Sequence, residues 1–140
     1  MRFLFLVTLC WSLCHAQEIT LNHITAAVCQ IETGTIYQGP GRVSGSFTQG
    51  AAGEIGPWQM LPVVFRERGL SESHARRSVA HYELAFTMHY QWLLDRTGSP
   101  FLALASYHRG LGGRYRKDAQ GYAARALNLA EKLAQEEAAK

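Results

Sequence analysis

The stretch ITLNHITAAVCQIETG, residues 19–34, predicts a helix with one apolar face that ends in a turn. Its apolar residues recur at three- and four-residue spacing, which is the spacing of one helix face. They are Ile24, Ala27, Val28 and Ile31. Gly34 is typical of the residue that follows a helix, so Glu32 is expected where the chain leaves this helix.

The segment after this helix, residues 34–56, is rich in glycine and has no periodicity. It predicts a loop or short hairpin, and a loop of this length in a small domain is usually functional. A second helix is expected from Pro57, and Pro62 would either kink it or start a new one. Two more helices are expected, from Ser71 to about Arg96 and from Phe101 to about His108. A glycine turn at 110–113 would separate these from a last helix within 118–140. No alternation of strands and helices supports a parallel sheet, so we expect a mainly α single domain.

The N-terminal segment has the order of a secretory signal peptide. Arg2 supplies positive charge, residues 3–13 are almost wholly apolar, and Cys14-His15-Ala16 has small residues at the cleavage positions. An apolar run of 11 residues is shorter than the ~20 that a membrane-spanning helix needs. Bulky residues before Cys10 and Cys14 also disfavour a lipoprotein signal. We therefore expect cleavage after residue 16 and a mature domain, residues 17–140, in the periplasm or otherwise exported.

Cleavage would remove Cys10 and Cys14 and leave Cys29 as the lone cysteine of the mature chain. The mature domain would then have no intrachain disulfide and would depend on its apolar core. Cys29 is predicted to be a small buried residue and not a nucleophile.

The chain has a formal charge of +3, with basic clusters at 66–77 and 109–117. Such clusters meet nucleic acid, anionic lipid or an anionic wall polymer, but are most often a solvated surface. We expect no nucleic-acid partner. The histidines His74, His81 and His89 are too widely spaced for a zinc motif, so neither a metal nor another cofactor is expected.

Three short motifs follow one another along the chain. They are IETG at residues 31–34, GEIGPWQMLP at residues 53–62 and ALASYHRG at residues 103–110. Their order and spacing resemble the soluble lytic transglycosylase family, in which a Glu at a helix end precedes a G-x-x-G-x-x-Q-x-x-P segment and a later tyrosine motif. The resemblance covers about residues 22–130 and implies a lysozyme-like fold.

The resemblance implies a role for several residues. Glu32 would be the single catalytic acid/base, a task that needs a carboxyl group held protonated by burial. A glutamate at a helix end is ordinarily a solvated residue, so this role depends on the motifs around it. The substrate contacts implied are Gln59, the glycines Gly53 and Gly56 that let the backbone pass close to the sugar, Tyr107, and Tyr122 near the catalytic glutamate.

The sequence departs from the family pattern at three places. Glu54 stands where a small residue is usual, and it is predicted to support the fold or the neighbouring motif. Trp58 follows Pro57 in place of a Leu-Met pair, and it either stacks on sugar, as Tyr37 also would, or belongs to the core. His108 replaces an asparagine, whose hydrogen bonds a neutral histidine can make, while its protonation would add a pH dependence.

The implied substrate is peptidoglycan, cleaved at the MurNAc–GlcNAc bond. Closure of the sugar's own 6-hydroxyl onto the cleaved centre would give 1,6-anhydro ends, whereas attack by water would make the protein a lysozyme-type hydrolase. The absence of an obvious second catalytic carboxylate favours ring closure. A third alternative is a non-catalytic wall-binding component of an envelope-spanning secretion or phage machine. We expect a monomer.

Overall fold

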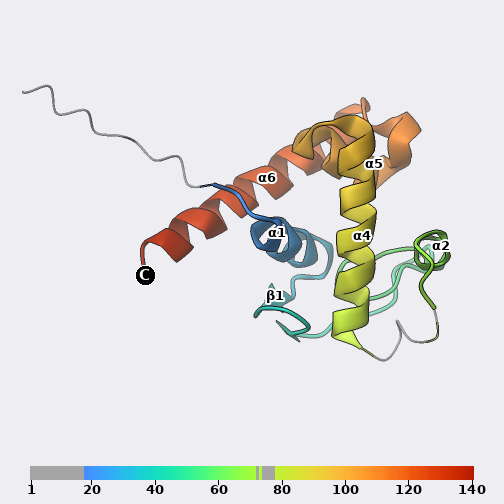
Figure 1. Cartoon of the computed structure of the whole chain (residues 1–140), viewed down its shortest axis with the longest axis horizontal. Coiled ribbons are helices and arrows are strands. Elements are labelled where there is room, and N and C mark those ends of the chain that lie inside the picture. Colours follow the sequence, from blue (N-terminus) through green and yellow to red (C-terminus); the bar gives the residue numbers. More distant parts are fainter. Residues whose placement is uncertain (1–17, 72, 74–77) are drawn as a thin grey trace, which may run out of the picture.

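Helix α1 (Leu21–Thr33) corresponds to the first predicted helix. It ends at Gly34, which has a left-handed backbone conformation with a φ of 73°. The computed structural model describes residues 18–71, 73 and 78–140. After α1 come β1 (Ile36–Tyr37), β2 (Val43–Ser44), α2 (Pro62–Glu67), α4 (Val79–Thr97), α5 (Pro100–Gly113) and α6 (Lys117–Ala138) (Figure 1). The prediction of a mainly α single small domain is confirmed. The predicted signal peptide, residues 1–16, lies outside the described residues.

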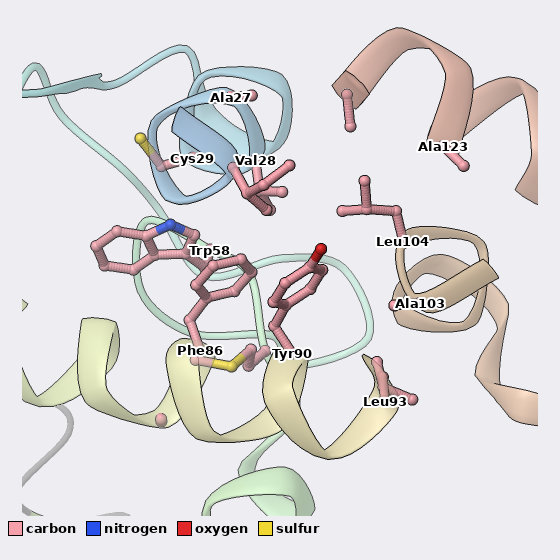
Figure 2. Close-up of a cluster of buried hydrophobic side chains, with 14 of the residues drawn as sticks. Ala27, Val28, Cys29, Trp58, Phe86, Tyr90, Leu93, Ala103, Leu104 and Ala123 are labelled. Atoms are coloured by element: carbon pink, nitrogen blue, oxygen red, sulfur yellow. The ribbon is translucent and has the colours of Figure 1, made fainter. Parts of the chain in front are cut away.

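Four helices enclose the core. Helix α6 packs on α1 and α5, and α4 packs on α5 (Figure 1). Figure 2 shows Trp58 and Phe86 between α1 and α4, with Leu104 of α5 on the far side of Tyr90. The face that α6 buries is almost entirely alanine, namely Ala119, Ala123, Ala126, Ala130 and Ala134. Small side chains let this helix approach its neighbours closely, so residues at the start of α6 reach the end of α1.

Within the glycine-rich segment, for which a loop or a short hairpin is predicted, the chain forms a short hairpin. Its strands pair antiparallel, with Ile36 opposite Ser44. Glu83 of α4 holds the hairpin, because one carboxylate oxygen accepts from the Tyr37 hydroxyl at 2.6 Å and the other from the Gly41 N–H at 2.5 Å. The hydroxyl of Tyr37 is thus engaged in the fold.

Two predicted helices differ from those in the structure. Pro57 opens no helix, because Ile55 and Met60 close a tight turn by an antiparallel bridge and α2 begins at Pro62. The long helix predicted from Ser71 to about Arg96 is not continuous, since Ser78 is extended, with φ −145° and ψ 125°, and α4 begins at Val79. Part of the intervening segment, residues 72 and 74–77, is outside the described residues.

The glycine turn predicted at 110–113 is also wrong in part. Helix α5 continues to Gly113, and only Gly110 leaves helical geometry, with φ 72° and ψ 167°. This φ is left-handed and suits glycine. The kink lies just after His108 and Arg109, at the end of α5 that faces the start of α6.

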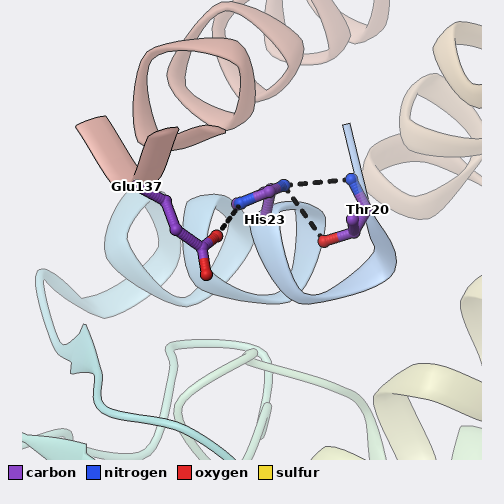
Figure 3. A network of polar contacts seen from close by, with 3 residues as sticks. All are labelled: Thr20, His23 and Glu137. Carbon is purple, nitrogen blue, oxygen red and sulfur yellow. Dashed lines mark hydrogen bonds and ion pairs between the residues drawn. The ribbon is translucent and has the colours of Figure 1, made fainter. Parts of the chain in front are cut away.

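The two ends of the domain are tied together. The backbone N–H of Thr20 donates to His23 Nδ1 at 3.0 Å, which leaves His23 Nε2 as the donor to Glu137 Oε2 at 2.6 Å (Figure 3). The contact fixes the last turn of α6 against the first turn of α1. Among the described helices, none is long and apolar enough to cross a membrane.

Candidate active site

Glu32 lies in the last turn of α1, and its side chain is half-buried at the wall of a cavity of about 450 Å³. We call this the Glu32 cavity. It is lined by Glu32, Gly50, Ala51, Glu54, Gln59, Met60, Leu61, Val64, His89, Tyr107, His108 and Arg109. The lining residues come from the end of α1, the loop and turn at 50–61, and helices α2, α4 and α5, so segments distant in sequence build one site.

The hydroxyl of Tyr122 donates a hydrogen bond to Glu32 Oε1 at 2.6 Å, across 90 residues of sequence. The Tyr122 side chain is buried, and its ring stacks on His108, with centroids 4.6 Å apart and planes 10° apart. Burial, and then the charge of Glu32, raises the pKa of Tyr122 well above its ordinary value. The hydroxyl therefore keeps its proton and remains a donor to the carboxylate.

Burial raises the pKa of the Glu32 carboxyl above its ordinary value. The hydrogen bond from Tyr122 acts in the opposite direction, because it favours the charged form, and the negative charge of Glu54 raises the pKa further. The net direction is upward. A raised pKa keeps the proton on a carboxyl group to higher pH, so a group at a cavity wall is better suited to give a proton and take one back.

Gln59 adopts a left-handed backbone conformation with φ 49° in the turn that Ile55 and Met60 close. Its side-chain N–H group donates to the carbonyl oxygens of Gly56 at 2.9 Å and Thr48 at 3.0 Å. Both amide donors are thus used within the protein. No described residue donates to Gln59 Oε1, and Gln59 is one of the residues that line the Glu32 cavity.

Gly53 and Gly56, which the resemblance implies as substrate contacts, are not among the residues that line the Glu32 cavity. Both have positive φ, 90° for Gly53 and 79° for Gly56. A Cβ at Gly56 would lie 2.5 Å from the Tyr82 ring. These glycines are required by the turn geometry and by close packing, and Gly50 and Ala51 line the cavity in their place.

The prediction that Trp58 contacts substrate is wrong for its side chain, which is fully buried. The indole N–H donates to the Thr25 carbonyl oxygen at 2.9 Å, and the ring stacks on Phe86 at 5.8 Å. The backbone of Trp58 does serve the site, because its carbonyl oxygen accepts from the Tyr107 hydroxyl. Trp58 thus anchors the turn that carries Gln59.

Tyr107 and His108, which the resemblance implies as substrate contacts, both line the Glu32 cavity from the last regular turn of α5. The exposed His108 also stacks on Tyr122, so it helps to fix the hydroxyl that binds Glu32. Burial of the ring and the charge of Arg109 lower its pKa, against the opposing effect of Asp118. The imidazole is therefore neutral at neutral pH, and its titration moves to lower pH.

His89 is a lining residue that sequence analysis missed. Its Nδ1 atom is buried without a hydrogen-bond partner among the described residues. Burial, and then the charge of Arg68, lowers its pKa to about 4. A usable signal was present, because His89 shares the apolar face of its helix with Phe86 and Leu93.

Glu54 also lines the Glu32 cavity, and its carboxylate accepts from the backbone N–H of Ala52 at 3.0 Å. Cys29 is buried as predicted, and burial raises the pKa of its thiol. A thiol with a raised pKa is a poor nucleophile. Within residues 18–71, 73 and 78–140, no three His, Cys, Asp or Glu side chains are grouped as metal ligands.

Replacing Tyr122 with phenylalanine is expected to raise the pKa of Glu32, because it removes the hydrogen bond that favours the charged carboxylate. Carbon-detected NMR titration of the Glu32 carboxyl group measures this directly and needs no substrate. Tyr37→Phe is the matched control, since its hydroxyl binds Glu83 and not Glu32. An unchanged or lowered Glu32 pKa in Tyr122→Phe would contradict the assignment.

Comparisons of the chain with protein-family models, with curated proteins and with solved structures found no match. The case for a site therefore rests on three observations about this chain. They are the half-buried carboxyl of Glu32, its hydrogen bond from Tyr122, and the cavity that Gln59 and Tyr107 also line. Together they describe a candidate acid/base site built on one carboxyl group.

Proposed function

We propose that this protein is a peptidoglycan lytic transglycosylase that cleaves the MurNAc–GlcNAc bond and leaves 1,6-anhydro ends. The observation that carries the proposal is the half-buried Glu32, whose carboxyl has a raised pKa and opens onto a cavity of about 450 Å³. The motifs that resemble the family support the same residue. Export by the predicted signal peptide would bring the enzyme to its substrate.

In the first step, protonated Glu32 gives its proton to the oxygen of the bond that breaks. The carbonyl of the sugar's own N-acetyl group stabilises the positive charge that develops at the anomeric carbon. The Glu32 carboxylate formed in this step accepts the hydrogen bond from Tyr122 at 2.6 Å. This hydrogen bond stabilises the negatively charged carboxylate of Glu32. Because the Tyr122 hydroxyl is already in place before the reaction, no side chain has to move to provide it.

In the second step, the Glu32 carboxylate takes the proton of the 6-hydroxyl of the same sugar. The freed oxygen bonds to the anomeric carbon and closes the anhydro ring, so Glu32 returns to its protonated form and no water is consumed. Gln59 Oε1 is placed to accept from a sugar hydroxyl or an N-acetyl N–H. Neutral His108 can make both kinds of hydrogen bond at the cavity rim.

The hydrolase alternative has one specific observation in its favour. Glu54 lines the same cavity as Glu32, so the cavity holds a second carboxylate that could activate a water molecule. Against it, the Glu54 carboxylate already accepts from the Ala52 N–H. A role as a wall-binding component of an envelope machine needs neither the raised pKa of Glu32 nor its bond from Tyr122.

Digestion of purified sacculi is expected to release muropeptides with 1,6-anhydro ends, which are lighter than the reducing-end products by one water. Mass spectrometry separates the two product classes, and a muramidase digest of the same sacculi provides the reducing-end standard. Reducing ends as the sole products would establish the hydrolase. No release by folded protein would favour the non-catalytic alternative.

A further inference from the structure

A second hollow of about 880 Å³ adjoins the Glu32 cavity. We call it the basic groove, and it is formed by His108, Arg109, Arg116, Lys117, Asp118 and Arg125 around Gly121. His108 and Arg109 line both hollows, so the two lie next to each other. The groove lies where the end of α5 meets the start of α6.

The basic groove holds more positive charge than its own acid can neutralise. Asp118 Oδ2 lies 2.6 Å from the Arg109 guanidinium, and its Oδ1 lies 3.5 Å from Arg116 Nε. Four cationic side chains and one carboxylate leave a formal excess of three positive charges. Among the described residues, no carboxylate pairs with Lys117 or Arg125. Lys117 also begins the 22-residue helix α6, whose N-terminal dipole adds positive potential.

The neighbouring Glu32 cavity has no comparable excess of positive charge, because the carboxyl groups of Glu32 and Glu54 line it together with a single arginine, Arg109. A polymer charged at every unit, such as a nucleic acid, would find matching positive charge in the groove but not in the cavity. A polymer with an uncharged backbone and acidic branches fits both hollows. Peptidoglycan has this pattern, since its sugar backbone is uncharged along the cleaved bonds and its peptide stems carry free carboxylates.

We propose that the basic groove binds a carboxylate of the peptide stem on the strand whose sugars occupy the Glu32 cavity. This inference rests on the proposed function and adds a substrate preference, for wall material that still carries its peptides. Lys117 and Arg125 supply the unpaired charges. They lie outside the Glu32 cavity, so they act on binding of the strand and leave the chemical step unchanged.

The test uses sacculi in three forms, namely intact, with peptides removed by an amidase, and with stem carboxylates converted to amides. Wild-type KM is expected to be roughly threefold to tenfold lower for intact sacculi than for the other two forms, the range that two exposed charge contacts provide. The double variant Lys117→Gln/Arg125→Gln should raise KM for intact sacculi by the same factor. Its kcat, and its KM for stripped sacculi, should stay as in the wild type.

Arg42→Gln/Lys132→Gln is the matched control. It removes the same charge from two exposed residues that line neither hollow, and its kinetics should equal those of the wild type. If its KM rose as much as that of the groove variant, net charge would explain the effect and the inference would be overturned. The inference would also be overturned if the wild type cleaved intact and stripped sacculi with equal KM. The proposed function would stand in that case.

Co-sedimentation with sacculi provides a readout that needs no turnover. Two results together support the groove assignment: the wild type binds amidated sacculi more weakly than intact ones, and the Lys117→Gln/Arg125→Gln variant binds intact sacculi more weakly than the wild type does. This support holds even if no substrate is cleaved, and in that case the proposed function alone fails. Equal binding to intact and amidated sacculi overturns the inference. Displacement from intact sacculi by a single-stranded oligonucleotide at physiological salt would assign the groove to polyphosphates and overturn it as well.

Discussion

Glu32→Gln is expected to lose at least roughly 10²–10⁴-fold of turnover on purified sacculi, the usual contribution of a positioned acid/base. The substitution keeps the size of the side chain and an oxygen for the Tyr122 hydroxyl, but removes the proton that the reaction needs. Thermal melting should stay close to that of the wild type. Turbidity clearing of sacculi measures the activity, and the melting curve shows that the loss is chemical.

Glu54→Gln is the control for loss of charge in the same cavity. It should keep most of the activity, because the mechanism uses one carboxyl group. The charge of Glu54 contributes to the raised pKa of Glu32, so its removal lowers that pKa. Since protonated Glu32 is the active form, the alkaline fall in activity should move to lower pH. If Glu54→Gln were folded and equally inactive, a two-carboxylate hydrolase mechanism would replace the proposed one.

Trp58→Ala is expected to reduce the free energy of unfolding by about 3–5 kcal/mol, as truncation of a buried aromatic side chain does. The change leaves a cavity beside Phe86 and removes the indole hydrogen bond to Thr25. This is a large share of the ~5–15 kcal/mol that a domain of this kind has in total. Urea denaturation followed by circular dichroism measures the loss.

Leu61→Ala is the matched control, since Leu61 lines the Glu32 cavity but is 40% exposed. It should change stability little. The sequence-based hypothesis that Trp58 stacks on sugar makes a different prediction, namely near-normal stability with a raised KM. That result for Trp58→Ala would contradict the structural assignment of this residue.

Local patterns predicted the helices well where one face of a helix had to be apolar. The stripe that includes Ile24 and Val28 is buried, and Gly34 ends α1 as expected. The predictions of helix boundaries were wrong where a residue is compatible with more than one backbone structure. Proline is tolerated both in a first helical turn and in a tight turn, so Pro57 alone did not distinguish a helix start from the turn at 55–60.

The sequence by itself determined the helical class, the end of α1 at Gly34 and the placement of Glu32 in its last turn, because these depend on neighbours three or four residues away. Only the tertiary structure decided which side chains meet Glu32. The hydrogen bond from Tyr122 to Glu32 spans 90 residues of sequence. Trp58 belongs to the hydrophobic core because it contacts α1 and α4. The basic groove exists because the alanine face of α6 brings the first turn of that helix against the end of α5. Burial and neighbouring charge, which set the pKa of Glu32, are properties of that packing and have no local sequence signature.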